Sequence, residues 1–157
     1  MRSAAADEGQ QIREAAFRLL AVRARSTREL RQRLRRKGFS SERVDEVIAY
    51  LQDNGYQSDE EFARLYAREK WTSSGWGPAR VRQALAEKGI ETGLREQVID
   101  EVYGGQDLME TVLVLARKKW AGMRDLPVTT RRRRLTGFLQ RRGYSWEIIN
   151  NIVNRLE

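Results

Sequence analysis

The segment from Leu30 to Phe39, LRQRLRRKGF, has a pattern that occurs three times in the chain and points to a repeated structural unit. The second copy, VRQALAEKGI, runs from Val81 to Ile90, and the third, LTGFLQRRGY, runs from Leu135 onward. Each copy has an apolar residue, a leucine four positions later, a glycine four positions after that, and then another apolar residue. The copies are offset by 51 and 54 residues. A period of this size is typical of a tandem structural repeat.

The glycine in each copy is predicted to end an α-helix. Glycine adopts the left-handed backbone conformation just past a helix end without steric cost, and the apolar residue after it packs back onto the last helical turn. A basic residue precedes each glycine, where it suits the negative end of the helix dipole. This geometry pairs Leu34 with Phe39 in the first copy, and it predicts the same pairing in the other two.

Two further amphipathic helices accompany each copy. Apolar residues recur at helical spacing before each copy and again after each glycine. Ser26 and Glu29 have the spacing of a capping box, and Pro78 suits a first helical turn. The prediction is an all-α protein of three tandem three-helix repeats that form an elongated, curved array. We expect a disordered N-terminal tail over 1–12 and repeats over 13–55, 56–105 and 106–157.

The composition argues against an enzyme. The chain has no cysteine and no histidine, so it lacks thiolate nucleophiles, the commonest zinc ligands and the commonest general base. It also has no phosphate-binding glycine loop, and no spacing brings two carboxylates together for hydrolysis. We therefore expect no catalytic residue, no metal and no cofactor. The chain has neither a long apolar run nor the apolar part of a secretory signal, so we expect a cytoplasmic monomer with no membrane contact.

Charge is strongly segregated along the chain, which carries a net charge of +8. Residues 23–37 hold eight Lys or Arg and one acid, residues 42–61 hold seven acids and one base, and residues 131–142 hold six Arg and no acid. A basic protein of this size favours anionic partners, although charge that only solvates the helices is the alternative.

Arginines on the second helix of each repeat are the candidate contacts. Arginine suits this role because its planar fork binds phosphate or carboxylate through two hydrogen bonds. In the first repeat three of them share the helix face opposite Leu30 and Leu34. In the third repeat a run of four opens the helix. The candidates are Arg28, Arg31, Arg35, Arg82, Arg131, Arg132, Arg133 and Arg134. Whether they contact protein or nucleic acid stays open.

The tryptophans allow two interpretations. Trp71 and Trp76 flank a short Thr-Ser-Ser-Gly turn, where they could stack on nucleic-acid bases or fill the joint between helices. Joint packing is the favoured interpretation, and Trp120 and Trp146 are interpreted in the same way.

Several motifs resemble the RecX family. AFRLLAVRARSTREL over 16–30 with RRKGF over 35–39 is similar to the first repeat of RecX proteins, and GWGPARVRQALAEKGI over 75–90 resembles their most characteristic stretch. Gly55 and Tyr56, followed by DEEFA over 59–63, resemble the start of their second repeat, while the third repeat is looser. The chain departs from the family in having Gln and Ser at positions 57 and 58, where Leu-Asp is frequent.

This resemblance implies a non-enzymatic regulator of RecA, usually an inhibitor. Such a protein binds the RecA–DNA filament, limits its growth, and suppresses its strand exchange and co-protease roles in recombination, DNA repair and the SOS response. Single- or double-stranded DNA is a further expected partner. The alternative is a stand-alone basic DNA-binding protein with helix-turn-helix-like repeats. The threefold repeat and the missing pattern of base-reading Asn and Gln count against that alternative.

Overall fold

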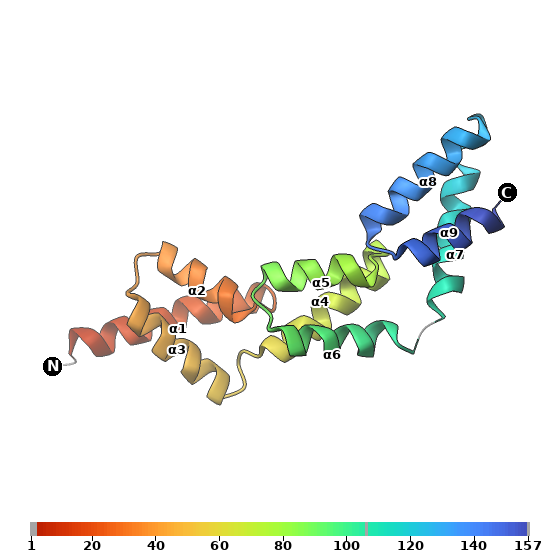
Figure 1. Ribbon diagram of the computed structural model, residues 1–157. Coiled ribbons are helices and arrows are strands. Elements are labelled where there is room, and N and C mark those ends of the chain that lie inside the picture. Colours follow the sequence, from red (N-terminus) through yellow and green to blue (C-terminus); the bar gives the residue numbers. More distant parts are fainter. Residues whose placement is uncertain (1–2, 106, 157) are drawn as a thin grey trace.

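The computed structural model describes residues 3–105 and 107–156, and every regular element in these ranges is an α-helix (Figure 1). The helices are α1 (Ala4–Val22), α2 (Thr27–Arg36), α3 (Ser41–Asp53), α4 (Asp59–Ser74), α5 (Pro78–Glu87), α6 (Thr92–Tyr103), α7 (Leu108–Ala121), α8 (Val128–Arg142) and α9 (Trp146–Arg155). The predicted fold class is therefore confirmed for the described part of the chain. No helix in that part is both long and apolar enough to cross a membrane.

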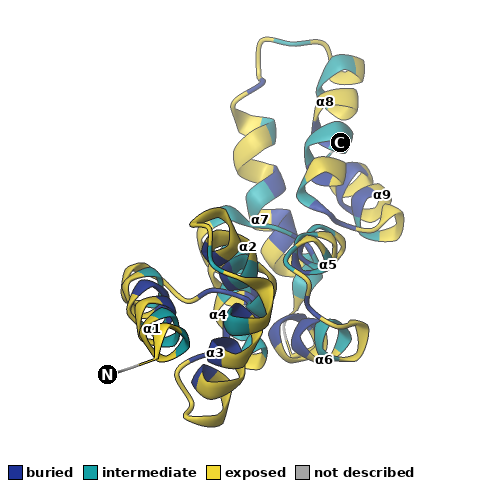
Figure 2. Ribbon diagram, turned by 90° about the vertical axis from the view of Figure 1, so that its left-hand side faces the viewer, coloured by how far each residue is buried: buried dark blue, intermediate teal, exposed yellow. Residues whose placement is uncertain are grey.

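The helices form three units, each with a core of its own. The first core is shared by α1, α2 and α3, the second by α4, α5 and α6, and the third by α7, α8 and α9. The units follow one another in an elongated, curved array (Figure 1), and their buried faces point into each group of three helices (Figure 2). The repeated leucines Leu34, Leu85 and Leu139 are fully buried, so the repeated pattern marks equivalent core positions.

The glycine-terminated helix ends are also confirmed. Gly38, Gly89 and Gly143 have φ values of 92°, 79° and 91°. The N–H groups that follow the second and third glycines donate to the buried leucine carbonyls, from Ile90 over 3.0 Å and from Tyr144 over 3.3 Å. These bonds satisfy carbonyls that the helix itself leaves unpaired, and they fix the direction in which the next helix leaves.

The expected disordered tail over 1–12 is wrong for residues 4–12, which form the first turns of α1. Ser3 caps the helix by accepting a hydrogen bond from the N–H of Ala6, and Ile12 is fully buried in the first core. The alanines of this segment favour helix, and the burial of Ile12 stabilises it by packing. A single buried residue leaves no apolar run in the sequence, so the helix was not predicted there. Met1 and Arg2 lie outside the described residues.

The second helices of the three repeats lie end to end along one edge of the array (Figure 1). The C-terminal end of α5 contacts the N-terminal end of α2 through Arg28 and the carbonyl of Glu87. The C-terminal end of α8 contacts the N-terminal end of α5 in the same way, through the carbonyls of Arg142 and Gly143. Opposite dipole ends meet at both joints, which is favourable. We call α2, α5 and α8 together the second-helix row.

Candidate functional site

Main-chain hydrogen bonds join the second and third repeats. The N–H of Gly77 donates to the carbonyl of Arg142 over 2.6 Å, and the N–H of Ala79 donates to the carbonyl of Gly143 over 3.2 Å. The hydroxyl of Tyr144 donates to the carbonyl of Gly75 over 2.6 Å. The start of α5 and the end of α8 thus satisfy each other's unpaired backbone groups, so the two repeats are held at a fixed angle.

Two glycines make this close approach possible. A Cβ atom on Gly143 would lie 2.4 Å from the backbone nitrogen of Arg80, and one on Gly77 would lie 2.6 Å from the carbonyl oxygen of Gly143. Both distances are far inside van der Waals contact, and both neighbours are backbone atoms that do not move independently. Glycine is required at this joint for space, in addition to the conformation at Gly143.

Side chains join the first and second repeats at the equivalent place. Glu29, on the first turn of α2, accepts a hydrogen bond from Lys88 over 2.6 Å and two from Arg23 over 3.0 Å each. Arg28 donates to the carbonyl of Glu87 over 3.3 Å and lies against Gly89. The N–H of Thr27 donates to Asp59 over 2.8 Å. This joint therefore depends on charge more than the second joint does.

Glu29 is the central residue of the first joint. Its side chain is only 12% exposed, and its capping box with Ser26 is formed as predicted. Burial by itself would raise the pKa of Glu29, but hydrogen bonds from Arg23 and Lys88 outweigh burial and lower the pKa to about 2. The carboxylate is therefore charged and paired at neutral pH.

Replacing Glu29 with glutamine is expected to lower the free energy of unfolding at pH 7 by about 2 kcal/mol. Because the folded pKa of Glu29 is depressed, its contribution is present above the unfolded value near 4.5 and disappears as pH falls toward 2. Urea unfolding at pH 7, 4 and 2.5 measures this difference. If the difference in free energy of unfolding between the unmodified protein and the Glu29→Gln variant stays constant with pH, the lowered pKa of Glu29 is contradicted. The Glu29→Gln/Lys88→Gln double-mutant cycle isolates the pairwise contribution.

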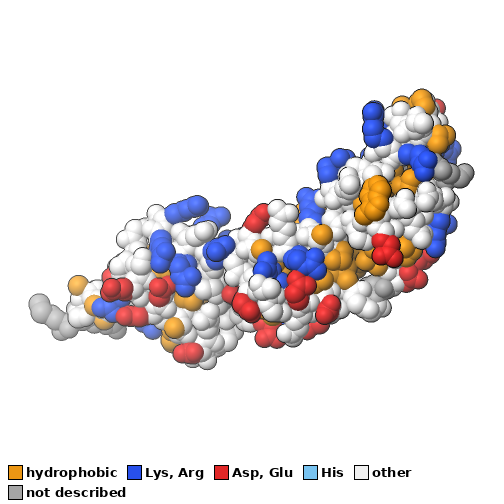
Figure 3. Space-filling view, viewed as in Figure 1, with side chains coloured by type: hydrophobic (Ala, Val, Ile, Leu, Met, Phe, Trp, Pro, Cys, Tyr) orange, Lys and Arg blue, Asp and Glu red, His pale blue; other side chains and the backbone are white. Residues whose placement is uncertain are grey.

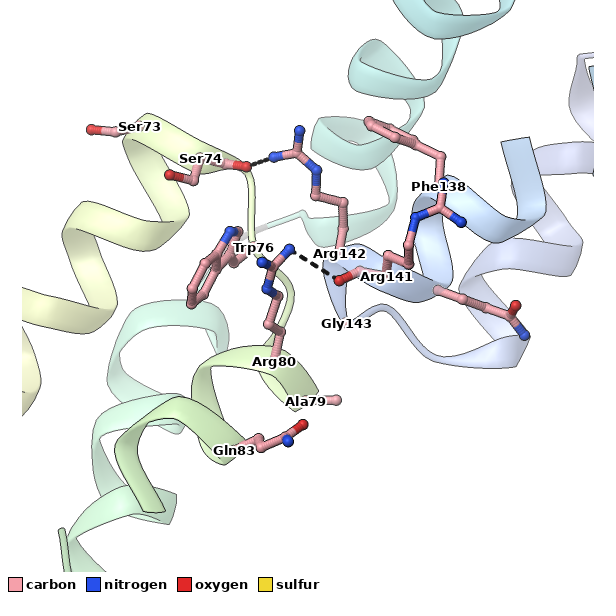
Figure 4. A pocket seen from close by; sticks show the side chains of 11 residues that line it. Ser73, Ser74, Trp76, Ala79, Arg80, Gln83, Phe138, Arg141, Arg142 and Gly143 are labelled. Atoms are coloured by element: carbon pink, nitrogen blue, oxygen red, sulfur yellow. Dashed lines mark hydrogen bonds between the residues drawn. The ribbon is translucent and has the colours of Figure 1, made fainter. Parts of the chain in front are cut away.

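Basic side chains line two adjacent hollows along α8. One hollow of about 1000 Å³ lies between the second and third repeats, where Arg80, Arg141 and Arg142 form its walls (Figure 4). A second hollow of about 1050 Å³ continues along α8, and Gln140 and Arg141 line both. Among the described residues, no carboxylate lines either hollow. We call this surface the α8 groove, and its charged residues are Arg80, Lys119, Arg132, Arg133, Arg134, Arg141 and Arg142.

Charge is distributed unequally between the two edges of the array. Figure 3 shows most Lys and Arg side chains of the viewed face along the upper edge, where α2 and α8 lie, and most Asp and Glu side chains along the lower edge near α3 and α6. α2 and α8 therefore give the second-helix row a basic edge, while α5 between them carries Arg80, Arg82 and Glu87. The third helices of the first two repeats form an acidic edge. The charge blocks in the sequence correspond to these edges.

Two of the predicted contact residues are already paired inside their repeats. Arg31 forms an ion pair with Asp45 over 2.8 Å, and Arg82 forms one with Glu96 over 2.7 Å. The hydrogen bond from Arg82 lowers the pKa of Glu96. Arg31 and Arg82 occupy equivalent positions, and each ties the second helix of its repeat to the third. These ion pairs stabilise the packing of the two helices, and they engage some of the guanidinium N–H groups that a partner would need.

The other predicted residues differ in what surrounds them. Arg131 lies 3.9 Å from the centre of the Trp120 ring and donates to the Trp120 carbonyl over 3.1 Å. Arg132 donates to Asn154 over 3.2 Å. Arg35, Arg133 and Arg134 are exposed and form no ion pair within the described residues. The structure brings Arg132, Arg133 and Arg134 together in the α8 groove and leaves Arg35 apart on α2.

The sequence prediction did not include four groove residues: Lys119, Arg80, Arg141 and Arg142. Arg142 had been interpreted only as the basic residue before the helix-ending glycine, and Arg80 and Lys119 reach the groove from other helices. The block of six arginines over 131–142 was the one signal that pointed to this region. These four groove residues come together only because the repeats dock at a particular angle, and the repeat pattern in the sequence does not specify that angle.

The tryptophans have separate roles. Trp71 borders the cores of both the second and third repeats and lies 5.1 Å from the Tyr103 ring, which agrees with joint packing. Trp76 carries the guanidinium of Arg80 at 3.9 Å and the ammonium of Lys70 at 5.1 Å from its ring centre. Trp146 is 63% exposed, so the interpretation of Trp146 as a packed residue is wrong.

Comparisons with known proteins cover almost the whole chain. Models described as the first, second and third three-helix domains of RecX match residues 13–51, 58–99 and 106–153. A protein named "Regulatory protein RecX" from Amycolatopsis mediterranei is 36% identical over 141 residues, covering 90% of this chain and 80% of that protein. One with the same name from Trichlorobacter lovleyi is 33% identical over 143 residues, covering 90% and 92%.

Solved structures agree with the fold. A crystal structure of RecX from Lactobacillus salivarius superposes with a TM-score of 0.83 at 24% sequence identity, covering 96% of this chain and 97% of that one. A second, described as regulatory protein RecX, gives the same TM-score at 21% identity, covering 96% and 74%. At this level of identity the likeness concerns the arrangement of the three repeats.

Proposed function

This chain belongs to the RecX family, and from that premise we propose that it binds the RecA–DNA filament and limits its growth and its activities in recombination and DNA repair. The relatives are named regulatory proteins, and a regulatory role follows from membership. The proposal adds the target and the direction of the effect. We propose further that the protein is cytoplasmic, monomeric and non-enzymatic and that it uses no cofactor.

The observation that carries the proposal is the second-helix row with its basic edge. The row contains 10, 10 and 15 residues in α2, α5 and α8, which corresponds to a contour of about 50 Å at 1.5 Å per residue. A long, curved edge with an excess of positive charge suits a partner that is itself extended and negatively charged. A RecA–DNA filament has both properties through its nucleic acid.

The rival function, a stand-alone DNA-binding protein, fits the geometry less well. In a helix-turn-helix unit a recognition helix lies in the major groove, against phosphates on both sides. The third helices of the first two repeats are α3, with Glu42, Asp45, Glu46 and Asp53, and α6, with Glu96, Asp100 and Glu101. Carboxylates at that position would be repelled by DNA.

Co-sedimentation separates these two functions. At 0.15 M salt the protein is expected to bind RecA-coated single-stranded DNA at least about tenfold more tightly than the same DNA without RecA, because contacts to RecA add to contacts with phosphate. Equal affinity for coated and bare DNA would favour the rival. RecA strand-exchange assays under the same conditions test whether the bound protein inhibits.

A further inference from the structure

We infer that the α8 groove holds the sugar–phosphate backbone of a nucleic-acid strand and does not read its bases. The inference deepens the proposed function, since both place a nucleic acid beside this protein. It adds where the strand lies and which groups hold it. It also assigns this role to Arg80, Lys119, Arg141 and Arg142 on the second and third repeats.

The groove has the charge and the length that a polynucleotide backbone requires. Its two hollows share Gln140 and Arg141, so they lie next to each other along α8. Between Arg132 and Arg142 the helix rises about 15 Å. One duplex strand presents a phosphate about every 3.4 Å along its axis, so this length matches about four phosphates. A single small anion would leave most of these cations unused.

The arginines at the joint are held in place before any ligand arrives. Arg80 stacks on Trp76 and donates one N–H to the carbonyl of Arg141 over 3.1 Å. Arg142 lies 5.0 Å from the centre of the Phe138 ring and donates to the carbonyl of Ser74. A guanidinium has five donors, so each retains N–H groups for an anion. Figure 4 shows these side chains on the walls of one hollow.

Each aromatic ring of this hollow has two cations close to it, which leaves less of the ring face for base stacking. Trp76 has Arg80 and Lys70 over its ring at 3.9 Å and 5.1 Å, and Phe138 has Lys119 and Arg142 at 5.2 Å and 5.0 Å. Proteins that stack bases need a free ring face. Contacts to phosphate carry no sequence information, so binding in this groove is expected to be independent of sequence.

An acidic peptide is the other anionic polymer that such charge attracts. Arginine clusters do bind acidic peptide motifs, but the other side chains of a bound peptide are generally anchored in apolar pockets. Polar groups form the larger part of the lining in both hollows of the α8 groove. The observations therefore favour the nucleic-acid backbone.

Fluorescence anisotropy with a 20-nucleotide oligo-dT, without RecA, tests the inference. The groove variant Lys119→Gln/Arg133→Gln/Arg141→Gln removes three cations whose side chains donate no hydrogen bond to any residue that the structure describes. The control variant Arg18→Gln/Arg68→Gln/Arg117→Gln removes three exposed cations from the first helices α1, α4 and α7. We expect the groove variant to bind at least about tenfold more weakly at 50 mM salt, with the slope of log K against log salt reduced by about 2. The control should lose less than half as much, and circular dichroism should show equal helicity for all three proteins.

Four results would overturn the inference. The first is an equal loss of affinity in the groove and control variants, and the second is no binding of the unmodified protein to oligo-dT at 50 mM salt. The third is a more than tenfold difference in affinity among oligo-dT, oligo-dA and an oligonucleotide of mixed sequence. The fourth is that polyglutamate displaces the labelled oligo-dT at the same charge concentration as unlabelled oligo-dT does. The last would identify an acidic-peptide site.

If RecA-coated DNA is still preferred in the co-sedimentation assay, the proposed function stands although the inference fails. If that preference is absent while the groove variant loses oligo-dT binding, the proposed function fails and the inference stands.

Discussion

Replacing Gly143 with alanine is expected to lower the free energy of unfolding by about 3 kcal/mol, from left-handed strain together with a steric clash. The residue has a φ of 91°, and the new Cβ would lie 2.4 Å from the nitrogen of Arg80. Relief of this clash requires the end of α8 to move away from the start of α5. That movement would break the hydrogen bonds from Gly77 and Ala79. Urea unfolding monitored by circular dichroism measures the loss.

Gly38 provides a matched control for this prediction. Its φ is 92°, almost the same as that of Gly143, but apart from its chain neighbours no atom of the described residues lies within 4 Å of a Cβ built on it. Gly38→Ala should therefore cost only the conformational strain, about 1 kcal/mol. Equal destabilisation by the two substitutions would mean that the joint between the second and third repeats is not tightly packed. The difference between them estimates the steric part alone.

The variant Arg35→Glu/Arg133→Glu/Arg134→Glu is expected to bind RecA-coated DNA about 100-fold more weakly at 0.15 M salt, on the order of 3 kcal/mol. These three predicted contact residues are exposed, and within the described residues their side chains form neither an ion pair nor a hydrogen bond. Their reversal therefore changes the basic edge with little effect on packing. The affinity should also depend less steeply on salt, because fewer counterions are released. Co-sedimentation across a salt series measures both quantities.

A charge-matched control separates local contact from net charge. Arg18, Arg68 and Arg117 lie exposed on the first helices α1, α4 and α7. Reversing these three residues to glutamate changes the net charge by the same amount but leaves the second-helix row intact. We expect this control to keep most of its filament affinity. Similar losses in both variants would show that overall charge, and not the basic edge, determines binding.

Local chemistry made the helix ends predictable from the sequence. A glycine flanked by a leucine four positions earlier and an apolar residue directly afterwards has few alternatives to a left-handed helix end, and Gly38, Gly89 and Gly143 all adopt one. Three copies at nearly equal spacing then imply three units. The start of α1 was missed because alanines and polar residues carry a weak periodic signal, although Ile12 is buried.

The candidate site was only partly predictable, because it depends on docking between repeats. Helical spacing placed Arg31 and Arg82 on an outer face, but it did not reveal that Asp45 and Glu96 would pair with them. The basic groove forms where the end of α8 meets the start of α5, more than sixty residues away in the chain. Contacts over that separation follow from the angle between units, which no local motif encodes.

The two joints also predict different sensitivities to solvent. Hydrogen bonds between main chains hold the second joint, while an ionic cluster around Glu29 holds much of the first. Salt screens ion pairs more than it weakens backbone hydrogen bonds. The first repeat is therefore expected to separate from the others at high salt or low pH before the third repeat does.

Electron cryomicroscopy of the protein bound to a RecA filament on single-stranded DNA would show which edge of the array faces the filament. We expect the second-helix row to face it, with α2, α5 and α8 following the filament surface and the α8 groove beside phosphate. Density that places the acidic edge of α3 and α6 against the filament, with the second-helix row turned to solvent, would contradict it.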